Sequence, residues 1–363
     1  MIQRKNSIVF QCPPHDVNQN VRLGTMQLTT NIRPLNDANR LGLDYRHEAA
    51  MLPWTSPIID AHIHIWGLQA ARDYFRIADW FGITEAWSQT PLQEVPAIKA
   101  AFGDRVHFVA VPDYSKRDDP ATFTTKWFDS IEQFADLGAK MIKFWSAPRG
   151  RDIHPSMTLD SPERQHAMKI AHGAGMMFMV HIADPDTWFA THYKDSNKYG
   201  TKDSQYLALE RLLDQYGDVK WLAAHMCGMP ENLDRLQQML DRHPNLYVDT
   251  SATKWMVREL SKHGDRLTDF IRHNTGRVLW GTDIVASDGH YKMAGDDQYA
   301  SRFWAMRTLF ETDYDGLSPI VDPDLSMIDP SLPRESVAML KGIKLDPTTL
   351  QSLYYDTTKA VLQ

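Results

Sequence analysis

From residue 58 onward, short apolar runs alternate along the chain with stretches of amphipathic helical pattern. The runs are rich in β-branched and aromatic residues, which predicts strands buried on both faces of a sheet. They lie at residues 58–65, 83–87, 106–111, 140–145, 177–181, 219–225, 246–249 and 278–283. The helical patterns lie near residues 69–81, 92–102, 121–137, 161–174, 205–216, 230–242 and 254–273. Eight strands alternating with helices predict an α/β fold with a parallel sheet, and eight is the number that closes a (β/α)8 TIM barrel.

An open, doubly wound sheet is the competing architecture. Such a sheet would require a glycine-rich phosphate-binding turn after its first strand. The chain has His62-Ile63-His64-Ile65-Trp66-Gly67 at that place, so the barrel is the preferred prediction.

Three further segments lie outside the eight units. Residues 1–57 are polar and interrupted by prolines, too polar to bury a core of their own, which predicts an arm over the domain or a neighbouring subunit. The domain proper would span residues 58–363. An excursion follows the eighth strand at 284–335, with a helical piece from Gln298 to Thr312 and then a Pro/Asp-rich loop, which predicts a lid or an interface. A helix near 346–361 would complete the outer ring.

Composition narrows the class of protein. The 363 residues are 43% hydrophobic and 23% charged, as is usual for a soluble globular protein. A net charge of −7, without a Lys/Arg block, argues against nucleic-acid binding. Cys12 and Cys227 are the only cysteines, so neither a disulfide framework nor a CxxC metal motif is expected. The chain lacks an apolar signal core and a run of about 18 apolar residues, which predicts a cytoplasmic protein with no membrane partner.

Five residues with metal-binding side chains fall at the ends of predicted strands. His62 and His64 share one face of the first strand, the fifth ends in His181, the sixth in His225 and the eighth in Asp283. Taken singly, each has a structural explanation, as a hydrogen-bonded histidine or a turn aspartate. Barrel enzymes, however, place their chemistry at the C-terminal ends of their strands, and imidazole and carboxylate groups bind divalent metals. Together the five therefore predict a metal site.

These motifs resemble the amidohydrolase superfamily, and most of all its amidohydrolase-related (amidohydrolase 2) branch, which includes lactonases and nonoxidative decarboxylases of aromatic or muconate-type acids. The resemblance runs from about residue 58 to 283, with a weaker match in the last helix. The residues that carry it are Asp60-Ala61-His62-Ile63-His64, Val180-His181, Ala224-His225-Met226-Cys227-Gly228 and Trp280-Gly281-Thr282-Asp283.

The resemblance implies one divalent metal ion, most often zinc, held by His62, His64, His181 and Asp283. His225 would be the catalytic imidazole beside the metal. Asp60 would lie deeper in the barrel as a structural partner.

Two departures from the branch concern the region that would cover a substrate. Ile284-Val285-Ala286-Ser287 stands where the branch often has a proline, and Asp356 stands where an asparagine commonly opens the last helix.

Lys143 lies on the fourth strand, where dinuclear members of the superfamily carry a carboxylated lysine that bridges two metals. Mononuclear members also have a lysine there, and a single metal is the preferred prediction. The alternative for Lys143 is an ammonium group paired with a carboxylate in the barrel mouth, near the substrate.

Five further residues follow strand ends and are candidates for substrate binding. The arginines could hold a carboxylate by forked hydrogen bonds or lie on surface loops, and the tryptophans could line a pocket or pack in the core. They are Arg149, Arg151, Trp66, Trp145 and Trp188.

Fold and ligands leave two reactions on a small molecule open. In a hydrolase, Asp283 would take the proton of a metal-activated water, and His225 would stabilise the oxyanion of an ester, lactone or amide. In a decarboxylase, Asp283 or His225 would protonate carbon as CO2 departs. Hydrolysis is the preferred prediction, because it is the commoner outcome across the superfamily.

A non-catalytic, metal-stabilised binding protein is a remote alternative. The arm and the excursion are compatible with a homo-oligomer, and the competing interpretation is a monomer whose barrel mouth is covered.

Overall fold

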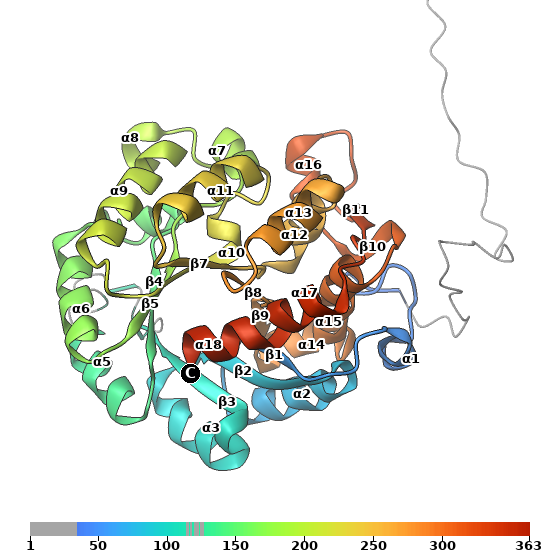
Figure 1. Cartoon of the computed structure of the whole chain (residues 1–363), viewed down its shortest axis with the longest axis horizontal. Coiled ribbons are helices and arrows are strands. Elements are labelled where there is room, and N and C mark those ends of the chain that lie inside the picture. The colour runs from blue at the N-terminus through green and yellow to red at the C-terminus, as the bar shows by residue number, and fades with distance from the viewer. Residues whose placement is uncertain (1–34, 114–115, 117, 120–122, 124–126) are drawn as a thin grey trace, which may run out of the picture.

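The computed structural model describes residues 35–113, 116, 118–119, 123 and 127–363. One sheet of nine parallel strands occupies its centre, in the order β8-β7-β6-β5-β4-β3-β2-β1-β9, and helices surround it (Figure 1). The strands are β1 (Ile58–Ile65), β2 (Ile83–Gln89), β3 (Val106–Ala110), β4 (Met141–Trp145), β5 (Met177–His181), β6 (Trp221–Ala223), β7 (Leu246–Asp249), β8 (Val278–Leu279) and β9 (Ile284–Ala286).

The two ends of the sheet are joined by the stretch of chain that holds β8 and β9. β8 pairs with β7, and β9 pairs with β1. Between them, the backbone N–H of Ala61 donates to the carbonyl of Trp280 (2.9 Å), and the N–H of Asp283 donates to the carbonyl of His62 (2.7 Å). The predicted α/β barrel is confirmed, with its eighth strand divided into two short pieces.

The register of β1 against β2 shifts between Asp60 and Ile63, which breaks the strict alternation of side chains along this strand. Ile59 and Ala61 pack in the apolar cluster inside the barrel, whereas Ile63 packs in the cluster between sheet and helices. Asp60 accepts a hydrogen bond from Tyr74, which lies on the helix that follows β1. The irregularity therefore places Asp60 and His62 on different sides of the strand, although simple alternation places them on one.

Helices occupy all the predicted positions, although one is divided and residues 121, 122 and 124–126 lie outside the described part of the chain. The helices around the barrel are α2 (Leu68–Ala78), α3 (Val95–Phe102), α5 (Trp127–Asp136), α6 (Pro162–Gly173), α7 (Asp186–Thr191), α8 (Ser196–Tyr199), α9 (Lys202–Gln215), α10 (Ala224–Cys227), α11 (Leu233–Arg242), α12 (Thr253–Leu260) and α13 (Asp265–His273). Three short helices, α7, α8 and α10, were not predicted. The prediction of one helix over 254–273 is wrong, because Gly264, with φ of +53°, separates α12 from α13. In the described part of the chain no helix has both the length and the apolar character needed to cross a membrane.

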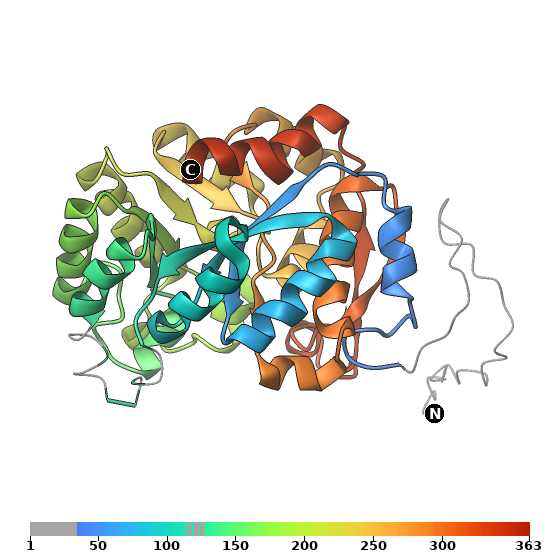
Figure 2. The same cartoon turned by 90° about the horizontal axis from the view of Figure 1, so that it is seen from below.

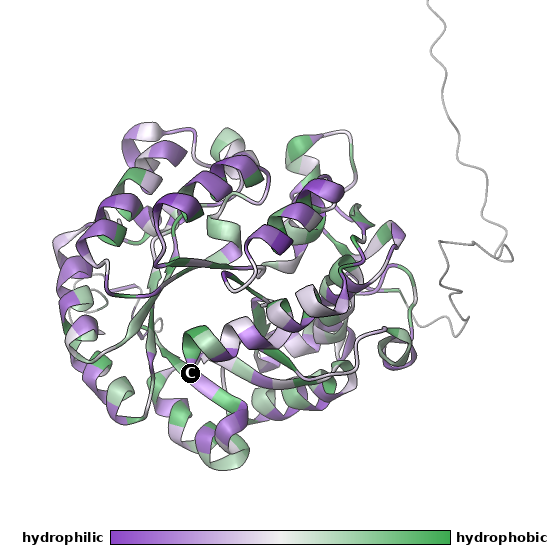
Figure 3. Cartoon of the chain, viewed as in Figure 1, coloured by the Kyte–Doolittle hydropathy of each residue, from purple (hydrophilic) through white to green (hydrophobic). Residues whose placement is uncertain are grey.

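Amphipathic spacing explains why these segments are helical. In α11, Leu233, Leu236 and Leu240 recur at three- and four-residue intervals and are buried against the barrel. Asn232 caps this helix by accepting a hydrogen bond from the N–H of Arg235 (3.0 Å). Hydrophilic and hydrophobic residues alternate along the outer helices in Figure 3, as expected of helices that cover a sheet on one side only.

The excursion after β9 has more regular structure than its sequence predicts. It contains α14 (Asp288–Ala294), α15 (Asp297–Glu311), α16 (Leu325–Ile328) and two antiparallel strands, β10 (Asp315–Val321) and β11 (Val337–Lys341). The Pro/Asp-rich loop is thus partly a hairpin, and Pro319 is tolerated because a two-stranded sheet has free edges. The last predicted helix is confirmed as α17 (Pro347–Gln351) and α18 (Thr357–Leu362), joined by a π-helical turn.

The described part of the arm, with α1 (Tyr45–Met51), lies against this excursion (Figure 2). The N–H of Arg40 donates to the carbonyl of Pro319 (2.8 Å), and the N–H of Val321 donates to the carbonyl of Asp37 (2.8 Å). Cys12, Pro13-Pro14 and Arg33-Pro34 lie outside the described residues.

A buried ion pair joins the excursion to the rest of the molecule. Within α15, the guanidinium of Arg307 donates to Glu311 (Nε to Oε1, 2.5 Å) and to the carbonyls of Trp54 and Phe81. Glu311 also accepts from the hydroxyl of Tyr354 (2.9 Å) and from the N–H of Trp54 (3.1 Å). The pair therefore links arm, barrel, excursion and C-terminal region at one point.

We expect Glu311→Ala to lower the free energy of unfolding by about 3–5 kcal/mol, because it leaves the buried Arg307 cation without its partner. Chemical denaturation followed by circular dichroism measures the change. Glu210→Ala is the matched control, since Glu210 pairs on the surface with Arg242 and its loss should cost no more than about 1 kcal/mol. Equal losses in the two variants would contradict the proposed weight of the buried pair.

Candidate metal centre

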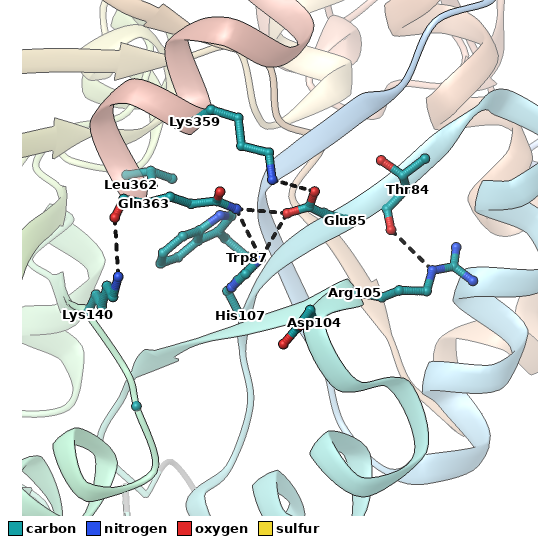
Figure 4. A pocket seen from close by; sticks show the side chains of 11 residues that line it. Thr84, Glu85, Trp87, Asp104, Arg105, His107, Lys140, Lys359, Leu362 and Gln363 are labelled. Atoms are coloured by element: carbon teal, nitrogen blue, oxygen red, sulfur yellow. Dashed lines mark hydrogen bonds and ion pairs between the residues drawn. The ribbon is translucent and has the colours of Figure 1, made fainter.

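Cavities at opposite ends of the barrel compete as the functional site. The first, about 630 Å³, lies where β2 and β3 begin (Figure 4), next to a cavity of about 390 Å³. Its Glu85 carboxylate is already engaged by Lys359 (2.6 Å), by the side-chain amide of Gln363 (2.8 Å) and by His107 (3.0 Å). This cavity is therefore a place where the C-terminal helix is fastened, and it lies at the end of the barrel opposite to that used for catalysis.

The second cavity, about 310 Å³, opens at the C-terminal ends of the strands. Side chains from the barrel and from the excursion line it together. Among them are His181, His225 and Asp283 from the barrel and His290, Arg302 and Asp324 from the excursion. The residues predicted to carry chemistry thus meet at this end.

Three of the four predicted metal ligands converge here. The Oδ1 atom of Asp283 lies 3.0 Å from Nε2 of His64 and 3.4 Å from Nε2 of His62. One potential ligand atom from each residue lies within 4.8 Å of those of the other two. Two imidazole nitrogens and a carboxylate oxygen in this arrangement suit a divalent ion such as zinc, and leave room for water or substrate as further ligands. These residues fit a metal ion, and we call them the metal triad.

Asp249 determines which nitrogen of His62 is available to a metal. This fully buried carboxylate accepts from Nδ1 of His62 (2.8 Å), which leaves the lone pair of His62 on Nε2. The side-chain amide of Gln89 also lies within hydrogen-bond distance of that Nε2 atom (2.8 Å). Burial acts to raise the pKa of Asp249, but its pairing with His62 and its hydrogen bond from Ser251 outweigh burial and lower that pKa. Burial, followed by the charge of Lys143, lowers the pKa of His62, which favours its neutral form.

Sequence reasoning missed Asp249 as a functional residue. Asp249 ends the seventh predicted strand, at the same end of the barrel as the histidines. That position at a strand end could have identified it from the sequence.

His225 lies beside the triad in a defined orientation. Its ring stacks on that of His62 (centroids 5.0 Å apart), and its Nδ1 lies 2.7 Å from Oγ of Ser251. Because the Ser251 hydroxyl donates to Asp249, its oxygen is left to accept from Nδ1–H of His225. Burial, and then the charge of His181, lower the pKa of His225 well below its ordinary value. The neutral ring therefore keeps a free lone pair on Nε2, which can accept a proton.

An unusual backbone conformation presents His225 to the cavity. His225, Met226, Cys227 and Gly228 all have positive φ, between 51° and 69°. Left-handed backbone costs a non-glycine residue about 1–2 kcal/mol. Gly228 is required at the end of this turn, since a Cβ there would stand 2.1 Å from the carbonyl oxygen of Ala183.

Asp283 also has a left-handed backbone conformation, with φ of +57°. The preceding residue, Thr282, is tied to Asp60 by its hydroxyl (2.6 Å) and its N–H (3.0 Å). Burial raises the pKa of Asp60 to about 7. Asp60 is thus a structural partner that fixes the turn carrying Asp283.

His181 and Lys143 lie close to the triad without joining it. Nε2 of His181 bonds to Oδ1 of Asp184 (2.7 Å), and its ring meets that of His225 edge to face at 4.5 Å. Nζ of Lys143 is buried 3.4 Å from Nε2 of His62, and burial lowers its pKa to about 8. The role predicted for His181, as fourth ligand, and the alternatives for Lys143, an ammonium near the substrate or a carboxylated bridge between two metals, stay predictions.

Of the predicted substrate-binding residues, Trp188 lines the cavity. Its Nε1–H and that of Trp255 both donate to Asp324 (2.9 and 3.0 Å). Trp66 is 44% exposed and lies with its edge towards His64.

The other three candidates are not among the described residues that line this cavity, and one of them, Arg151, bonds instead to Gln205 (2.7 Å). The other two are Arg149 and Trp145. Sequence reasoning missed Lys254, Trp255, His290 and Arg302, which do line the cavity and carry no motif that would reveal them.

The model of a family described as amidohydrolase (Amidohydro_2) matches residues 97–314. No curated protein matches the chain.

Similar solved structures include an apo protein from Agrobacterium tumefaciens (14% identity, TM-score 0.47, covering 85% of this chain and 96% of that one). Another is 2,6-dihydroxybenzoate decarboxylase from Rhizobium, with 14% identity and a TM-score of 0.42, covering 76% of this chain and 96% of that one. A third is 5-carboxyvanillate decarboxylase from Novosphingobium aromaticivorans, complexed with manganese. It has 13% identity and a TM-score of 0.41, covering 68% of this chain and 90% of that one.

We expect His62→Ala, His64→Ala and Asp283→Ala each to abolish stoichiometric metal binding, because each removes one of three converging ligand atoms. Elemental analysis of the purified proteins by mass spectrometry measures the bound ion. His107→Ala, which removes a carboxylate-paired histidine at the opposite end of the barrel, should leave the metal content unchanged. Full metal content in all three triad variants would rule out this site.

Asp249→Asn should weaken metal binding by about 10- to 100-fold, because an amide no longer fixes the tautomer of His62. Competition with a chromogenic chelator measures the affinity. Asp218→Asn is the matched control, since it alters the carboxylate partner of the exposed His172 and leaves His62 untouched. An unchanged affinity in Asp249→Asn would show that His62 needs no such partner.

Proposed function

The chain belongs to the amidohydrolase family, and we propose that it is a metal-dependent enzyme that removes CO2 from a small organic acid. The observation that carries this proposal is the charge of the cavity beside the metal triad. Lys254 and Arg302 line the same cavity of about 310 Å³ as Asp283. Every decarboxylase substrate is an acid, whereas many hydrolase substrates are neutral. Two cations in a lining that also holds Asp283 and Asp324, but that form no ion pair with either carboxylate, favour decarboxylation.

A single divalent ion held by His62, His64 and Asp283, zinc by preference for this ligand set, would act as a Lewis acid on substrate oxygen atoms. His181 is the proposed fourth ligand. The triad also keeps the substrate close to His225, which stacks directly on His62.

His225 is the proposed proton carrier. Its Nε2 accepts a proton from an acidic O–H of the substrate or from solvent, while Ser251 and Asp249 hold the ring through Nδ1. The bond between carbon and the departing carboxylate breaks, CO2 leaves, and the electron pair stays with the substrate. The proton on Nε2 is then delivered to that carbon, which returns His225 to its neutral form.

Hydrolysis is the second candidate, and one observation favours it. Burial acts to raise the pKa of Asp283, but its hydrogen bond with His64 and the neighbouring imidazoles of His62 and His225 outweigh burial and lower that pKa well below its ordinary value. An ionised carboxylate at the triad can accept a proton from an attacking water. The sequence-based preference for hydrolysis is therefore kept as the alternative.

A substrate screen separates the two reactions. Aromatic and unsaturated carboxylic acids, lactones, esters and amides are incubated with the metal-loaded protein, and released CO2 and released acid are measured separately. Release of CO2 with loss of one carboxylate supports the proposal. Acid release from lactones, esters or amides, with no CO2 from any acid, would replace it by hydrolysis.

With a substrate in hand, His225→Ala should lower kcat by about 10²- to 10⁴-fold, because it removes the proton carrier. The bound metal should stay stoichiometric, since His225 is outside the triad. In the other group that could hold a metal, His62, His225 and Asp249, the imidazole of His62 is already hydrogen-bonded to Asp249. Metal analysis and steady-state kinetics on the same preparation test both statements. A variant with full metal and wild-type kcat would exclude His225 from the reaction.

A further inference from the structure

Lys254 and Arg302 approach the second cavity from different parts of the chain. Lys254 lies in α12, which follows the seventh strand, and Arg302 lies in α15 of the excursion. Both side chains are partly buried and line the cavity together with His225 and Asp283. The excursion therefore supplies one of the two cations that face the barrel's chemistry.

Among the described residues, no carboxylate forms an ion pair with either cation, although Asp324 lines the same cavity. The guanidinium of Arg302 donates to the carbonyl of Gln298 (2.5 Å) and to Oγ of Ser301 (3.1 Å), both of which are neutral. Within the described part of the chain, no hydrogen bond or ion pair holds the ammonium of Lys254.

The nearby carboxylates have other partners. Arg258 pairs with Asp322 and lies 3.3 Å from Asp324, and Asp324 also accepts from Trp188 and Trp255. These carboxylates raise the pKa of Lys254 only in part, and the larger effects of burial and of the charge of Arg302 lower it. Burial lowers the pKa of Arg302 to about 10, which keeps this side chain charged at neutral pH.

Two like charges partly withdrawn from water repel each other, and an anion between them would relieve that repulsion. A guanidinium and an ammonium group both make strong, charge-assisted hydrogen bonds with carboxylates. The cavity volume of about 310 Å³ is near the lower limit for small-molecule sites, so this anion would belong to a small molecule.

The carboxylate at this position is not the one that departs. A departing carboxylate loses its charge as CO2 forms, so ion pairs to it stabilise the ground state more than the transition state and slow the reaction. Cations at the cavity wall are useful only to a carboxylate that keeps its charge throughout. This step rests on the proposed decarboxylation.

We propose that Lys254 and Arg302 form a subsite for a second, retained carboxylate, and that the substrate is a small dicarboxylic acid with its reacting end at the metal triad. The subsite determines specificity and takes no part in bond breaking. Removing either cation should raise KM and the dissociation constant of dianions, with a smaller effect on kcat.

Binding of unreactive probes tests the subsite without any turnover. Isophthalate carries two carboxylates and benzoate one, and calorimetry on the metal-loaded protein gives both dissociation constants. Wild-type protein should bind isophthalate about 10- to 100-fold more tightly than benzoate. Lys254→Met and Arg302→Met should each lose most of that preference, and Arg302→Lys should keep part of it.

Lys292→Met is the matched control, because Lys292 lies exposed on α14 of the same excursion and should leave the preference intact. Thermal melting confirms that each variant is folded. If Arg302→Met fails to fold, Lys254→Met and Arg302→Lys still decide the question. A wild-type protein without preference for the dianion, or folded variants that retain the full preference, would overturn the subsite.

The subsite and the reaction can fail separately. A dianion preference that depends on Lys254 and Arg302, with no CO2 from any acid, upholds the subsite as an anion site and rejects decarboxylation. Release of CO2 with equal KM in wild type and variants rejects the subsite and upholds the reaction.

Discussion

The buried carboxylate of Asp249 organises the C-terminal end of the barrel. It accepts from Nδ1 of His62 on β1, from the N–H of His225 after β6, and from the N–H of Ser251 after β7. Three separate segments are thus held by one charge, which has no exposure to solvent. A buried carboxylate is tolerated only when such donors replace its water, so the folded chain must assemble all of them together. The orientation of both imidazoles is then fixed by the fold itself.

Backbone strain is concentrated around the same point. Among the described residues, six non-glycine residues have positive φ, and four of them, His225, Met226, Cys227 and Asp283, lie at strand ends of the site. A fifth, Ala252, lines the cavity. Such conformations persist where surrounding contacts determine them, as the bonds of Asp60 to Thr282 do for Asp283. The barrel therefore gives up part of its stability to place His225 and Asp283 at the cavity.

The sequence predicts the barrel well because its signal is local. Each buried strand is an apolar run, and each covering helix has its own amphipathic period. The histidines were identifiable because the ends of parallel strands meet at one side of the sheet. The shift within β1 that separates Asp60 from His62 depends on pairing with β2, and no single segment encodes it. Lys254 and Arg302 meet through packing between α12 and the excursion, so spacing along the chain could not reveal their proximity.

Helix α15 has a part in both recognition and folding. Arg302 reaches the cavity, and little more than one turn further on Arg307 and Glu311 connect the arm, the barrel and the C-terminal region. Replacing the whole excursion in a relative of this chain would therefore also require changes in the arm, barrel and C-terminal residues that contact the buried ion pair. Changes of substrate in this lineage would be expected to arise by single replacements on the cavity face of α15, with the opposite face of the helix left unchanged.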